Sequence, residues 1–117
     1  MSRKKAPFKS YEGKKSNDKH IRLTADMMTN KKFLKLPSSS KVLYMYMKLW
    51  ALGKEEFEYA ESLSSKYMSK MTFYSARDKL IENGFIDIVQ TNKFSHIPNK
   101  YKFSSKWRDW FSLFLFL

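Results

Sequence analysis

Residues 69–90 read SKMTFYSARDKLIENGFIDIVQ, and this stretch decides the fold. Ser69 is a favourable N-cap, and the pattern after it predicts a helix over 70–83. The buried stripe of this helix is expected to consist of Phe73, Ala76 and Leu80. Asn83-Gly84-Phe85 then predicts a Schellman stop, because glycine accepts the left-handed backbone conformation that such a stop requires.

The chain after the stop has the pattern of two strands. Phe85–Val89 is rich in β-branched and apolar residues, and Lys100–Phe103 alternates between basic and aromatic residues. The polar stretch 91–99, which contains Pro98, separates the two. The sequence therefore predicts an antiparallel hairpin with a basic loop.

The chain before residue 69 predicts a central helix and shorter elements around it. Apolar residues recur at helical spacing over 39–52, and Ser38-Ser39-Ser40 offers caps for the start of that helix. The apolar positions are Val42, Leu43, Tyr46, Met47, Leu49 and Trp50, and we expect both Tyr46 and Trp50 in the core. A short strand is predicted at 57–59, a two-turn helix at 61–67, and one short helix with an extended lead-in within 21–36.

Composition limits the classes of function. The 117 residues suffice for one domain, and 43% hydrophobic residues suffice for a core. The absence of cysteine excludes disulfides and thiolate metal sites, and two histidines cannot form a multi-histidine metal cage. The formal charge of +12 favours a polyanionic partner, with nucleic acid ahead of an acidic membrane surface. We expect three parts: a flexible basic arm at 1–20, a domain at 21–104, and an aromatic helix or tail at 105–117.

The order of the predicted elements is that of a winged helix-turn-helix domain. The predicted fold class is thus mainly α with a small antiparallel β-hairpin (α+β). In such a domain the helix at 70–83 enters the major groove of DNA, and the hairpin lies along the sugar-phosphate backbone. The residues expected to contact DNA are Lys70, Thr72, Tyr74, Ser75, Arg77 and Lys79 in the helix, and Lys93 and Lys100 in the hairpin. No metal-ligating, cofactor-binding or catalytic residues are predicted.

Several short stretches resemble one family. They are Phe33-Leu34-Lys35-Leu36-Pro37, Ser40-Lys41-Val42-Leu43-Tyr44, Met71-Thr72-Phe73, the stretch from Lys79 to Ile86, and Asn99 to Phe103 leading to Trp107. In this order they resemble the winged-helix domains of replication and accessory proteins of Gram-positive plasmids, phages and conjugative elements. The resemblance implies binding to double-stranded DNA in replication control or transcription.

The sequence thus predicts a cytoplasmic, non-enzymatic DNA-binding protein. The main alternative is a winged-helix module that contacts proteins and does not bind DNA. A third, in which the basic arm and the Phe-Leu tail contact lipid, ranks below both, and no membrane partner is expected. The apolar tail 110–117 either packs over the core or is buried by a second chain, which makes a homodimer through this segment a further expectation. A truncated or frame-altered end would explain the same pattern.

Overall fold

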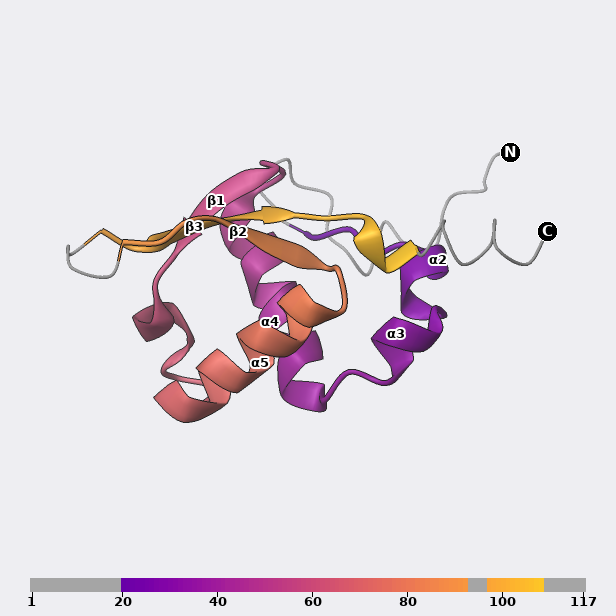
Figure 1. Ribbon diagram of the computed structural model, residues 1–117, viewed down its shortest axis with the longest axis horizontal. Helices are drawn as coiled ribbons and strands as arrows, with labels where there is room; N and C mark the ends of the chain where they lie inside the picture. The colour runs from indigo at the N-terminus through magenta and orange to yellow at the C-terminus, as the bar shows by residue number, and fades with distance from the viewer. Residues whose placement is uncertain (1–19, 93–96, 109–117) are drawn as a thin grey trace, which may run out of the picture.

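The computed structural model describes residues 20–92 and 97–108 of the chain (Figure 1). Outside these ranges lie all of the predicted basic arm except His20, together with Lys93 and most of the aromatic tail. The elements, in order, are α2 (Ala25–Met28), α3 (Lys31–Leu34), α4 (Ser38–Ala51), β1 (Glu56–Tyr59), the 3₁₀ turn η1 (Glu61–Ser64), α5 (Lys70–Glu82), β2 (Ile86–Gln90), β3 (Asn99–Phe103) and the 3₁₀ turn η2 (Lys106–Arg108).

The described residues form an α+β fold with one antiparallel sheet in the order β1-β3-β2. The predicted hairpin is confirmed as β2 and β3, and β1 adds a third strand that pairs with β3. Tyr101 on β3 lies opposite Phe57 on β1 and Ile88 on β2. Because side chains alternate along a strand, Lys100 and Lys102 point to the opposite face from Tyr101.

Both long helices cover the same face of the sheet, and the core lies between these two layers (Figure 1). Among the described residues, the most completely buried large side chains come from α4, α5, the strands and the turn between α5 and β2. They include Leu43, Met47, Phe73, Leu80, Phe85, Ile86 and Tyr101. Phe85 contacts both Phe33 and Tyr44 edge to face, and Trp107 stacks on it with ring centroids 6.0 Å apart. The aromatic residues therefore join the N-terminal helices to the end of the described chain.

The N-terminal part forms two short helices where the sequence predicted one. Thr24 caps α2 and Asn30 caps α3, each by accepting a backbone N–H with its side-chain oxygen. A cap between Met28 and Lys31 divides the predicted helix, because Asn30 holds an extended backbone conformation. The predicted two-turn helix at 61–67 is also shorter, since only the 3₁₀ turn η1 forms there.

Two predictions for α4 are wrong. The serines do not cap this helix: Pro37 is its N-cap without a side-chain hydrogen bond, and Ser38 is already helical. Trp50 is not in the core, because 52% of its surface is exposed, and Tyr46 is only half-buried. The buried stripe of α4 consists of Ser40, Leu43, Tyr44, Met47 and Ala51.

Candidate nucleic-acid interface

Helix α5 begins and ends where the sequence predicts. The Ser69 hydroxyl accepts the backbone N–H of Thr72 at 3.1 Å, which makes Ser69 the N-cap. At the other end, the N–H of Phe85 donates to the Leu80 carbonyl at 2.9 Å, and the N–H of Gly84 donates to the Ile81 carbonyl at 3.1 Å. These two bonds form the Schellman stop, with Gly84 at φ +83°. Local interactions alone therefore fix both ends of the helix.

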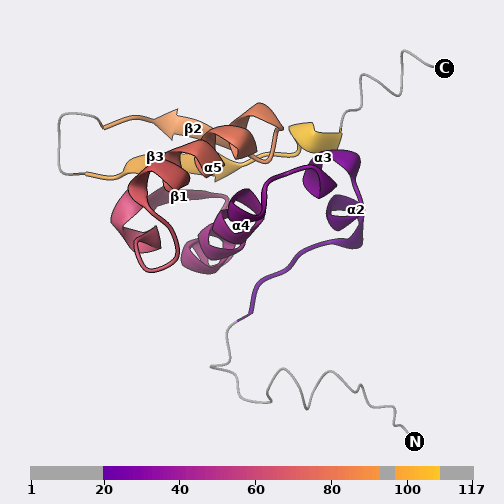
Figure 2. The same cartoon turned by 90° about the horizontal axis from the view of Figure 1, so that it is seen from below.

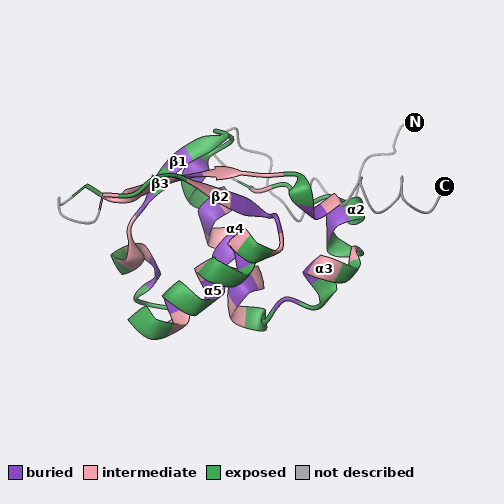
Figure 3. Ribbon diagram, in the orientation of Figure 1, coloured by how far each residue is buried: buried purple, intermediate pink, exposed green. Residues whose placement is uncertain are grey.

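A buried hydrogen bond fixes α5 against α4. Ser40 is fully buried, and its hydroxyl donates to the carbonyl oxygen of Ala76 at 3.0 Å. Phe73, Ala76 and Leu80 form the buried stripe of α5, as predicted. The other side of the helix is exposed along its length (Figure 3).

The exposed side of α5 carries most of the helix residues predicted to contact DNA. Lys70 and Ser75 are exposed, and Tyr74 is 38% exposed. Lys79 is exposed one turn after Ser75, with its ammonium 3.8 Å from Glu82. Residues four apart are neighbours on a helix surface, so Lys70 adjoins Tyr74 and Ser75 adjoins Lys79 along this exposed strip.

Thr72 and Arg77 lie outside this strip. Thr72 is half-buried, and its hydroxyl accepts a 3.0 Å hydrogen bond from Ser69. Arg77 is half-buried; its guanidinium lies 4.9 Å from the ring centroid of Tyr74 and donates to Asp78 at 2.9 Å. Burial alone would lower the pKa of Arg77, but the nearby Tyr101 hydroxyl and Asp78 outweigh it and raise that pKa. Arg77 is therefore already engaged within the fold.

Acidic side chains occupy the second half of the exposed side of α5. Asp78 and Glu82 are exposed there, and each lies in an ion pair with a basic residue of the same helix. The first half, from Lys70 to Ser75, contains no acidic residue. Approach of a polyanion is thus electrostatically favoured at the N-terminal half of α5, where the helix dipole also places positive charge.

The hairpin contributes one predicted residue to the described surface. Lys100 is half-buried on β3, with Glu58 of β1 beside it on one side and Gln90 of β2 on the other. The neighbouring carboxylate partly offsets its charge. In two views the first turn of α5 lies toward the same end of the molecule as the end of β2 and the start of β3, away from α2 and α3 (Figures 1 and 2).

Sequence reasoning missed Met71. Its side chain is 83% exposed, more than any other large hydrophobic residue in the described chain. It occupies the second position of α5, on the same side as Tyr74 and Ser75. Its spacing could have identified it, because positions 71, 74, 75 and 78 lie opposite the apolar stripe of Phe73, Ala76 and Leu80.

A metal-binding cluster and a membrane-spanning helix are both absent from residues 20–92 and 97–108. No three or more histidine, aspartate or glutamate side chains in these ranges are grouped so as to hold a metal ion. None of the helices formed by these residues has the length and apolar character needed to cross a membrane.

No protein-family model matches this chain, and no curated protein or solved structure matches it significantly. A function for it must therefore be argued from its own residues and geometry.

Proposed function

We propose that this chain is a cytoplasmic, non-enzymatic DNA-binding protein with a winged helix-turn-helix fold. In this proposal α4, η1 and α5 are the three helical elements, β2 and β3 form the wing, and β1 is the short strand after the first helix. The chain order and the sheet order β1-β3-β2 support this assignment. The setting, replication control or transcription of a mobile element, rests on the sequence resemblance alone.

The observation that carries the proposal is the exposed, acid-free first half of α5. Lys70, Met71, Tyr74 and Ser75 project from a helix that is capped at Ser69 and held to α4 by the buried bond from Ser40. A rigid helix with short polar and basic side chains at its start suits the major groove, which is about 12 Å wide. The formal charge of +12 supplies attraction to phosphate.

In this proposal the predicted residues take different roles, and their contacts within the fold support the division. Lys70 and Lys79 have flexible exposed side chains that suit phosphate contacts, whereas Tyr74 and Ser75 suit contact with base edges. Arg77 acts as a positioning residue, because its guanidinium already lies against the Tyr74 ring. Lys100 lies on the wing, which the proposal places along the sugar-phosphate backbone of the DNA. Thr72 stabilises the start of α5 through its hydrogen bond with Ser69.

A salt titration of duplex binding tests the proposal. Fluorescence anisotropy with a labelled mixed-sequence duplex is measured over a range of salt concentrations, for the full chain and for a Lys70→Glu/Lys79→Glu variant. The logarithm of the affinity should fall linearly with the logarithm of the salt concentration, by about 0.9 per phosphate neutralised. The variant should bind at least about tenfold more weakly at low salt, and its slope should be smaller by about 2.

A charge-matched variant provides the control. Lys31 and Lys35 are exposed at the start of α3 and directly after it, at the end of the molecule opposite to the first turn of α5 (Figures 1 and 2). Lys31→Glu/Lys35→Glu changes the net charge by the same amount and should retain most of the affinity. Equal loss in both variants would mean that net charge, and not the α5 surface, holds the duplex. Absence of duplex binding by the full chain would refute the proposal and favour the protein-contacting module.

A further inference from the structure

Helix α4 has a second apolar side that the core does not use. Leu49, Trp50 and Leu52 are 42%, 52% and 61% exposed. Tyr46 stacks on Tyr67 with ring centroids 3.9 Å apart, so part of this side is covered by the chain after η1. Together with Leu63 and Tyr59, these residues line an open cavity of about 520 Å³. This volume lies within the range of pockets that bind apolar groups.

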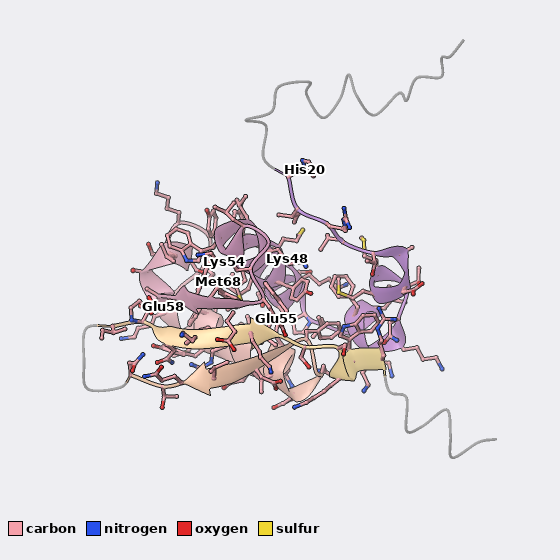
Figure 4. All side chains as sticks on the ribbon, turned by 90° about the horizontal axis from the view of Figure 1, so that it is seen from above. His20, Lys48, Lys54, Glu55, Glu58 and Met68 are labelled. Atoms are coloured by element: carbon pink, nitrogen blue, oxygen red, sulfur yellow. The ribbon has the colours of Figure 1, made fainter. Side chains whose placement is uncertain are left out.

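Cavities that share lining residues form a series along α4, and this cavity is the third in that series. The first lies beside Trp107 and Arg108, and shares Arg22, Lys48, Glu55 and Phe103 with the second. The second shares Leu49 and Leu52 with the apolar cavity. We call this series, from Arg108 to Tyr67, the α4 groove. In Figure 4, Lys48 lies between His20 of the lead-in and Glu55 before β1, within the middle cavity.

The segment after Arg108 has the composition to fill this groove. Residues 110–117, WFSLFLFL, contain seven apolar side chains among eight residues. Arg108 itself lines the first cavity and is held by an ion pair of 3.6 Å with Asp26. The nine residues from 109 to 117 span at most about 30 Å when extended. The rise of α4 from Tyr44 in the first cavity to Leu52 in the last is only about 12 Å.

We propose that residues 110–117 lie in the α4 groove of their own chain, with the aromatic and leucine side chains against Leu49, Trp50 and Leu52. Burial of these exposed side chains together with the apolar segment is favourable at roughly 25 cal/mol per Å² of apolar surface. The basic N-terminal segment is the less suitable occupant, although it joins the groove at His20. Its seven Lys and Arg residues would meet Arg22, Lys48 and Lys54 there.

The absence of cysteine from the chain permits a direct test. Ser112→Cys in the full chain carries a nitroxide spin label, and amide signals are recorded by NMR with the label oxidised and reduced. The label should cause selective loss of signal intensity for residues 46–54 and around Tyr67. The loss should disappear in a Ser112→Cys/Leu52→Glu variant, because a carboxylate in the apolar cavity opposes insertion of the segment.

Met71→Glu is the matched control, since Met71 is also an exposed apolar residue but lies on α5. In the Ser112→Cys background it should leave the signal loss at residues 46–54 unchanged. A mixture of spin-labelled unenriched chain and unlabelled ¹⁵N-enriched chain separates the sources of any contact. Signal loss in that mixture would assign the groove to a second copy and overturn the proposal. Signal loss confined to other surfaces, or unchanged by Leu52→Glu, would overturn it as well.

Discussion

Replacement of Gly84 by alanine should destabilise the fold more than any other alanine substitution of a glycine in the described chain. Gly84 has φ +83°, and an alanine there carries a left-handed cost of roughly 1–2 kcal/mol. A Cβ atom would also lie 2.7 Å from the backbone nitrogen of Trp107 and 2.8 Å from the carbonyl carbon of Lys106. Because backbone atoms must move to relieve this contact, overpacking adds about 1–3 kcal/mol.

Gly53 allows the cost of the left-handed backbone to be measured apart from the cost of the steric contact. It has φ +87°, yet nothing lies within 4 Å of the position that its Cβ would take. Gly53→Ala should therefore show the left-handed cost alone, and Gly84→Ala should lose about 1–3 kcal/mol more. Urea unfolding followed by far-ultraviolet circular dichroism measures both free energies of unfolding. Equal losses in the two variants would refute the view that η2 closes tightly over the end of α5.

Two further predictions follow from the buried hydroxyl of Tyr44 and from exposed Met71. Burial raises the pKa of Tyr44 to about 12. The native state thus keeps a proton that the unfolded chain releases near pH 10. Below pH 10 both states hold this proton, so the free energy of unfolding has its full value there. It should fall by on the order of 2–3 kcal/mol between pH 10 and 12. Tyr44→Phe should flatten this fall in urea midpoints measured across that range. If α5 reads base edges, Met71 should contact thymine methyl groups. A duplex with deoxyuridine in place of thymine should then bind the full chain more weakly than the thymine duplex does. A Met71→Ala variant should bind the two duplexes with the same affinity. If the replacement weakened binding equally for both proteins, the contact would be excluded.

The sequence was most informative where local interactions determine the structure. Both ends of α5 were predicted to within one residue, because Ser69 and Gly84 act on backbone groups only a few residues away. The hairpin was predicted for the same reason, from alternation around a polar loop. The pairing of β1 with β3 was not predicted, since the partner strands are separated by about forty residues and short strands carry little pattern.

Predictions were weaker where the sequence offered two solutions. Apolar residues surround much of α4, and the period alone does not say which side meets the core. The chain buries Leu43, Met47 and Ala51, and leaves Leu49 and Trp50 exposed. Ser40 decides between the sides, because its hydroxyl is satisfied by the Ala76 carbonyl only when that stripe faces α5. Ser40, which the sequence predicts as a helix cap, instead forms a buried contact between α4 and α5.

The same reasoning applies to the candidate interface. The sequence predicts Arg77 and Lys79 as DNA contacts from their charge, but charge does not show which cations already have partners within the fold. In the fold Arg77 is engaged with Tyr74 and Asp78, while Lys70 has no ion pair with any described residue. An incoming phosphate must compete with Asp78 for Arg77 but meets no such competitor at Lys70. A bound phosphate therefore displaces no existing ion pair at the first turn of α5. Substitution of Lys70 should lower the affinity for a polyanion more than substitution of Arg77 does.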